Sequence, residues 1–84
     1  MEPRIVAFGE AALLVELGTT PDLALNAWVH ALARSLDATP LDTQTNLVPG
    51  YVSVLVEFDP LLVDLSAAHA ELATRVQRLG AGRA

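Results

Sequence analysis

The 84 residues suffice for one domain with a modest core, and a hydrophobic content of 52% argues against disorder. Ten acidic against five basic residues give a net charge of −5, which argues against nucleic acid and anionic membrane surfaces as partners. The absence of cysteine excludes disulfides and thiolate chemistry, and the lack of a signal peptide or an apolar run of about 20 residues leads us to expect a cytoplasmic protein.

Two β-strands are expected at the N-terminus. Arg4–Phe8 is a short run of β-forming residues. Apolar residues alternate along Ala11–Leu17, so that Leu13, Val15 and Leu17 share one apolar face. Gly9-Glu10 between the two runs predicts a hairpin.

A helix is predicted next. Thr20 is expected to cap it, Pro21 suits the first helical position, and Asp22 complements the helix dipole. Apolar residues then recur at intervals of three and four, which is typical of a helix with one buried stripe. The stripe consists of Leu25, Trp28, Val29, Leu32 and Leu36.

Two further strands are expected around a Pro49-Gly50 turn. Thr43–Val48 carries alternating polar residues, which is typical of a sheet edge. Tyr51–Phe58 alternates strictly until Asp59-Pro60 ends it. Its apolar side, predicted to face the core, carries Val52, Val54, Val56 and Phe58, and its outer side carries Tyr51, Ser53, Leu55 and Glu57.

A second amphipathic helix is predicted to begin near Asp64 or Ser66, either of which can cap it, and to end at Gly80. Glu71 and Arg75 are one turn apart and are expected to pair. The apolar stripe consists of Leu65, Ala68, Leu72, Val76 and Leu79.

The element order ββαββα predicts an α+β fold in two layers, with a four-stranded antiparallel, ferredoxin-like sheet and two helices on one face. Right-handed crossovers place Ala11–Leu17 and Tyr51–Phe58 side by side in the centre. Thr43–Val48 then lies outside the second of these and Arg4–Phe8 outside the first. Arg4–Phe8 thus occupies the edge position that the last strand holds in the usual ferredoxin-like sheet.

No catalytic or metal-ligating constellation emerges from the spacing. His30 and His69 lie off the apolar stripes without a partner at metal spacing, and both are interpreted as surface histidines. Ser53 lacks a nucleophile-elbow motif, and residues 8–18 lack the glycine spacing of a phosphate loop. The remaining candidates, interpreted as solvated or capping carboxylates, are Glu10, Glu16, Glu57 and Asp59.

Two helix residues admit a second interpretation. Trp28 lies on the apolar stripe and is expected in the core rather than at an interface. Asn26 lies beside that stripe and is expected to tie down a loop through its amide rather than to contact a ligand. We therefore expect no catalytic residue, metal or cofactor in this chain.

Three stretches together resemble a known family: FGEAALLVELG (8–18), LNAWVHALARSL (25–36) and LVPGYVSVLVEFDP (47–60). They are similar to the N-terminal domain of the KipI/PxpB family, which includes allophanate hydrolase subunit 1 and the PxpB component of 5-oxoprolinase. That family shows a Gly-Asp-x-Ala-Leu strand opening, an asparagine near a helix start, and a Val-Pro-x-Tyr-x-Ser-Leu-x-Val strand ending in Asp-Pro. The family-motif residues here are Gly9, Glu10, Asn26, Pro49, Gly50, Tyr51, Ser53, Asp59 and Pro60.

The chain departs from this family in three respects. Glu10 stands where the family has aspartate. Thr43-Gln44-Thr45-Asn46 stands where the family has Gly-Val-x-Asp/Glu, so a glycine and an acid are missing. The second, cyclophilin-like domain of the family is absent, and residues 1–84 are interpreted as a single domain.

The resemblance implies one of two roles. PxpB-type proteins act with two further subunits in the ATP-dependent opening of 5-oxoproline to glutamate, so ATP is implied for the full complex but not for this chain. KipI-type proteins bind a sporulation histidine kinase and block its autophosphorylation. The first implies a non-catalytic domain that assembles with a PxpC-like subunit, and the second implies a kinase-inhibitor module. A stand-alone dimerisation domain is the third alternative.

The outer side of the predicted sheet is the expected interface. It carries Tyr51, Ser53 and Leu55, with alternate residues of Ala11–Leu17 beside them. Because nothing in this chain forms a third layer over it, we expect the protein to self-associate or to bind a protein partner through the sheet rather than through its helices.

Overall fold

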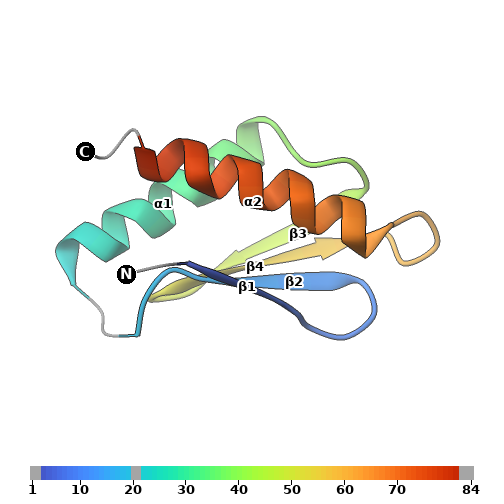
Figure 1. The fold of residues 1–84 in the computed structure, drawn as a ribbon, viewed down its shortest axis with the longest axis horizontal. Helices are drawn as coiled ribbons and strands as arrows, with labels where there is room; N and C mark the ends of the chain where they lie inside the picture. The colour runs from blue at the N-terminus through green and yellow to red at the C-terminus, as the bar shows by residue number, and fades with distance from the viewer. Residues whose placement is uncertain (1–2, 20–21, 82–84) are drawn as a thin grey trace.

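The computed structural model describes residues 3–19 and 22–81 (Figure 1). The element order is ββαββα, as predicted. The elements are β1 (Arg4–Ala7), β2 (Ala12–Glu16), α1 (Leu23–Ala38), β3 (Gln44–Pro49), β4 (Ser53–Phe58) and α2 (Leu65–Ala81). Neither helix in the described part combines the length and the hydropathy needed to cross a bilayer.

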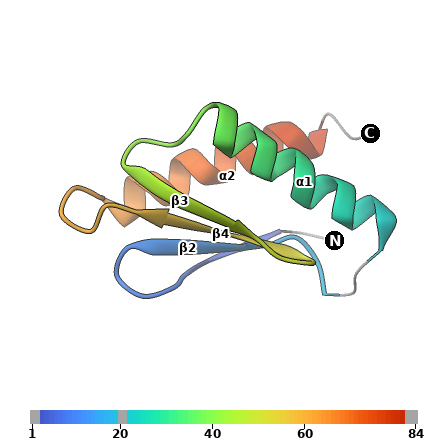
Figure 2. The same cartoon turned by 180° about the vertical axis from the view of Figure 1, so that it is seen from behind.

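The four strands form one antiparallel sheet in the order β1-β2-β4-β3. Both helices pack on the same face of this sheet and leave the other face uncovered (Figures 1 and 2). The strand order is the predicted one, although only α1 crosses between two strands of the sheet. A bulge between Gln44 and Asn46 interrupts the edge strand β3 near its start.

The core lies between the inner face of the sheet and the stripes of the two helices. All five predicted stripe residues of α1 are buried. Of the predicted inner residues, Val54, Val56 and Phe58 in β4 are buried, and Val52, just before the strand, is partly buried. In α2, the middle of the stripe is buried, and its ends, Leu65 and Leu79, are partly buried. The alternation and the helical periodicity therefore assigned the buried faces correctly.

Aspartates begin both helices. Asp22 is the N-cap of α1, and its carboxylate accepts a hydrogen bond of 2.7 Å from the Leu25 amide. The cap is thus Asp22 and not Thr20 as predicted, because α1 begins only at Leu23; residues 20–21 lie outside the described residues. At α2, Asp64 Oδ1 accepts hydrogen bonds from the amides of residues 66 and 67, at 3.0 and 3.2 Å.

The prediction that Gly80 ends α2 is wrong. The helix continues through Gly80, which packs against the ring of Trp28. A Cβ atom at this position would lie 3.2 Å from the ring, so glycine here permits close approach of the two helices.

The predicted Glu71–Arg75 pair is also wrong. The Arg75 guanidinium reaches the C-terminal end of α1 instead, where Nη1 donates to the carbonyl oxygens of Ser35 at 3.1 Å and Thr39 at 3.0 Å. It also donates to Ser35 Oγ at 3.0 Å. Ser35 O also accepts a 2.9 Å hydrogen bond from the Thr39 amide, so Arg75 adds a second donor at this helix end, where a cation is favoured.

The residue that leads into β3 has an unusual backbone. Thr43 has a φ of 66°, in the left-handed region that β-branched residues rarely adopt. Its Oγ1 is buried and has no hydrogen-bond partner among the described residues. Its carbonyl accepts a 2.8 Å hydrogen bond from the Asp59 amide, which fixes the turn against the end of β4. The resemblance places glycine here, and glycine adopts this conformation without strain.

We expect Thr43→Gly to raise the free energy of unfolding by about 0.5–1 kcal/mol, although glycine usually destabilises a folded chain. The gain from relieving the left-handed backbone should exceed the extra entropy of glycine in the unfolded state. Urea denaturation measures the change. Thr45→Gly, an exposed position within β3, is the matched control and should lower stability. A less stable Thr43→Gly variant would contradict this interpretation.

Candidate functional site

The fold separates the family-motif residues into two groups at opposite ends of the sheet. Gly9 and Glu10 lie in the β1–β2 turn, beside the end of β4 and Asp59-Pro60, because Phe58 N donates to Ala11 O at 2.8 Å. The other group lies at the β3–β4 turn and the first half of α1.

The first group has structural roles. Gly9 has a φ of 76°, which the tight β1–β2 turn requires. Asp59 Oδ1 accepts a 2.9 Å hydrogen bond from the Leu61 amide and so shapes the turn into α2. This agrees with the interpretation of Asp59 as a capping carboxylate.

The second group lines a pocket, which we call the turn pocket. Asn26 and His30 contribute from α1, and Pro49, Gly50 and Tyr51 contribute from the β3–β4 turn. The pocket has a volume of about 330 Å³. It thus brings Asn26 together with three consecutive family-motif residues of a distant turn, along with a histidine interpreted only as a surface residue.

The β3–β4 turn determines how Tyr51 is presented. Gly50 N donates to Ser53 O at 2.7 Å, and this tight closure keeps Tyr51 and Val52 out of the strand. β4 therefore begins at Ser53, two residues later than predicted. The side chain of Tyr51 is 79% exposed, and it belongs to the turn pocket rather than to the sheet face on which it was predicted.

The turn pocket offers polar groups that can bind a partner through hydrogen bonds. Its amide, imidazole and phenol groups can each donate or accept a hydrogen bond, and no carboxylate is among its lining residues. The side chain of Asn26 makes no hydrogen bond to the other described residues, and the expectation that it ties down a loop stays a prediction. Asn26 lines the turn pocket.

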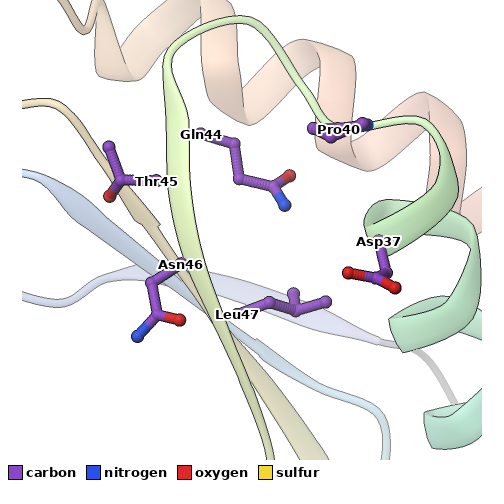
Figure 3. A pocket seen from close by; sticks show the side chains of 6 residues that line it. All are labelled: Asp37, Pro40, Gln44, Thr45, Asn46 and Leu47. Atoms are coloured by element: carbon purple, nitrogen blue, oxygen red, sulfur yellow. The ribbon is translucent and has the colours of Figure 1, made fainter.

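A second pocket lies beside the edge strand β3, and its polar groups serve the fold (Figure 3). Gln44 Oε1 accepts from the Leu41 amide at 3.0 Å, and Gln44 Nε2 donates to Leu36 O at 3.1 Å. Gln44 thereby fastens the α1–β3 loop at both ends. The pocket is lined by Asp37, Pro40, Gln44, Thr45, Asn46 and Leu47.

The face of the sheet away from the helices, which we call the outer face, carries a line of apolar side chains. Val6 pairs with Leu14, Leu14 with Leu55, and Leu55 with Val48, so that each strand contributes one residue. We call these four residues the apolar row. The first three are partly buried by their neighbours, and Val48 is 46% exposed. Leu55 therefore lies on the outer face as predicted.

Polar residues border the apolar row on both sides. On one side, Arg4 Nη2 lies 3.1 Å from Glu16 Oε1, and Ser53 is next to Glu16 in register. On the other side, Asn46 Nδ2 donates to Glu57 Oε1 at 2.8 Å. Both glutamates thus have partners within the face, and they form no carboxylate pair with each other.

No metal site is found among the described residues, where no three histidine, aspartate or glutamate side chains are grouped closely enough. His30 and His69 are exposed on separate helices. The residues present offer binding surfaces at the turn pocket and the outer face.

Residues 3–83 match the family described as carboxyltransferase domain, subdomain C and D. The chain belongs to this family. Comparison with curated proteins gave no match. Among solved structures, this carboxyltransferase C/D domain is similar to the conserved uncharacterized protein PH0987 from Pyrococcus horikoshii, with 29% identity over 90% of the chain and a TM-score of 0.83. It spans 35% of that protein's length.

The carboxyltransferase C/D domain also shares its fold with the N-terminal domain of the histidine kinase inhibitor KipI from Bacillus subtilis. The identity is 17% and the TM-score is 0.75, over 93% of this chain and 87% of that one. The family match and this shared fold confirm the resemblance to the KipI/PxpB N-terminal domain that the sequence motifs indicated.

Proposed function

We propose that this domain is the non-catalytic N-terminal part of a cytoplasmic subunit of the 5-oxoprolinase or allophanate hydrolase type. Its role is to dock a PxpC-like partner subunit of an ATP-dependent ring-opening complex. The observation that carries the proposal is the turn pocket, which gathers Asn26, Pro49, Gly50 and Tyr51 beside His30. No nucleophile paired with a general base lines it.

The surroundings of the turn pocket have the character of a protein interface. Leu23, Asn26 and His30 follow one another at helical spacing on α1, and Leu23 is 91% exposed. Tyr51 adds a second large exposed side chain from the turn. Exposed aromatic and aliphatic anchors around a few hydrogen-bond donors are typical of sites that bind another protein. ATP and the substrate are assigned to the other parts of the complex.

The proposal is tested by copurifying the tagged chain with a PxpC-like subunit encoded in the same genome. We expect a complex, and we expect Tyr51→Ala and His30→Ala each to weaken it about tenfold or more, because truncated interface anchors typically cost above 1 kcal/mol. Leu61→Ala is the control, since Leu61 is 91% exposed in the β4–α2 turn at the far end of the sheet.

The same preparations are assayed with ATP and either 5-oxoproline or allophanate. We expect no turnover by the isolated chain. Turnover above a heat-inactivated sample would refute the non-catalytic assignment. A partner subunit that binds both pocket variants as tightly as the wild type would refute the assigned surface.

A second candidate function follows from the shared fold with the KipI domain, whose parent protein is named a histidine kinase inhibitor. On this alternative the chain is a module that inhibits a kinase. Inhibition of histidine kinase autophosphorylation by the purified chain, together with no binding to the PxpC-like subunit, would favour it over the first proposal.

A further inference from the structure

The apolar row crosses the whole outer face without interruption. The three registered pairs that build it place Val6, Leu14, Leu55 and Val48 on a single line across four strands. Both helices lie on the opposite face, so nothing in the described part of the chain covers this line (Figures 1 and 2). We propose that a second copy of this chain covers it, with the two outer faces stacked about a two-fold axis.

The outer face is complementary to itself. Two sheets stack about 10 Å apart with their strands nearly aligned, so the two-fold axis runs either along the strands or along the apolar row. With the axis along the strands, Leu14 faces Leu55 of the other copy and Val6 faces Val48. With the axis along the row, each row residue faces its own equivalent. In both arrangements an apolar side chain meets an apolar side chain.

The charged residues of the outer face also fit a second copy. With the axis along the strands, Glu16 faces Ser53 of the other copy and Glu57 faces Ala12, because β2 then lies over β4. With the axis along the row, Glu16 faces Ala12 and Glu57 faces Ser53. Each glutamate therefore meets a small neutral residue in either arrangement, and no two like charges are opposed.

The size of the face sets the strength of the dimer. Four strands about 4.8 Å apart and five residues deep define a flat area on the order of 300–350 Å² per copy. A standard stable interface buries about 800 Å² per partner. The dimer is therefore expected to be weak and transient.

Sedimentation velocity of the purified chain between roughly 10 and 500 µM tests the proposal across this range. We expect a concentration-dependent shift from monomer to dimer. Leu14→Thr and Leu55→Thr keep a β-forming residue but remove the apolar contact, and each should weaken the dimer about fivefold or more. Leu61→Thr removes an equally large exposed side chain outside the sheet and should leave the dimer unchanged. Circular dichroism confirms that each variant is folded.

A wild-type chain that stays monomeric up to about 500 µM would overturn the proposal, since the proposed dimer would then have no measurable population. A dimer that survives both row variants, or that Leu61→Thr abolishes, would also overturn it by placing the contact elsewhere. These results are independent of the proposed docking of a PxpC-like partner. That function depends on Tyr51 and His30 in the turn pocket, while the dimer depends on the apolar row.

Discussion

Replacing Val54 by aspartate is expected to lower the free energy of unfolding by about 3–5 kcal/mol. Val54 is fully buried in the central strand β4, on the face that the helices cover. An aspartate there brings a carboxylate into the core without a partner, and the chain must either bury the charge or protonate it. Urea denaturation followed by the fluorescence of Trp28 measures the loss. The variant is expected to be largely unfolded if the wild type has the marginal stability usual for a domain of this size.

The control for Val54→Asp is Glu57→Lys, in the same strand but on the outer face. Glu57 accepts one hydrogen bond from Asn46, and this contact is exposed. The amide oxygen of Asn46 can accept a hydrogen bond from a lysine in turn. We expect a change below about 1 kcal/mol. Similar losses from the two substitutions would show that the two faces of β4 are wrongly assigned.

Replacing Arg75 by methionine is expected to lower the free energy of unfolding by about 1–3 kcal/mol. Methionine keeps much of the apolar stem of the side chain, so the loss reports mainly on the guanidinium. That group donates to the carbonyls of Ser35 and Thr39 and to the Ser35 hydroxyl, and it links α2 to the C-terminal end of α1. Thermal unfolding followed by circular dichroism measures the change.

Arg78→Met on the same helix provides the control. Arg78 is exposed in the last turn of α2, where a cation contributes only a few tenths of a kcal/mol to helix stability. An Arg75→Met variant no less stable than Arg78→Met would contradict the assigned role of the three hydrogen bonds. Arg75→Lys should recover part of the loss, because an ammonium can replace some but not all of the guanidinium contacts.

The sequence by itself determined the fold of this protein and the faces that it buries. The two-residue alternation of β2 and β4 and the helical spacing of the stripes in α1 and α2 are local patterns. Each follows from the geometry of a single element, so no knowledge of the neighbours was needed. The predicted strand order is also the observed one, and it rests on the expected ferredoxin-like arrangement in which α1 crosses from β2 to β3. The family also followed from the sequence, since the motifs of residues 8–18, 25–36 and 47–60 keep their order and spacing.

The tertiary structure alone decided the contacts between elements. Arg75 is one turn from Glu71 in sequence, but its guanidinium binds the carbonyls of Ser35 and Thr39 at the C-terminal end of α1 instead. Gly80 has the residue type of a helix end, and only the position of Trp28 shows that it permits close packing. A single sequence carries no signal for such pairs, because the partners are separated by many residues.

The candidate sites divide in the same way. The outer position of Leu55 follows from alternation, and the apolar row then requires only the strand register. The turn pocket required the whole fold, because α1 and the β3–β4 turn meet only when the helix packs across the sheet. The sequence motifs named Asn26 and Tyr51 separately, but only packing brought them together with His30. Local periodicity determines which face of each element is buried, and the packing of elements against one another determines which side chains meet at a site.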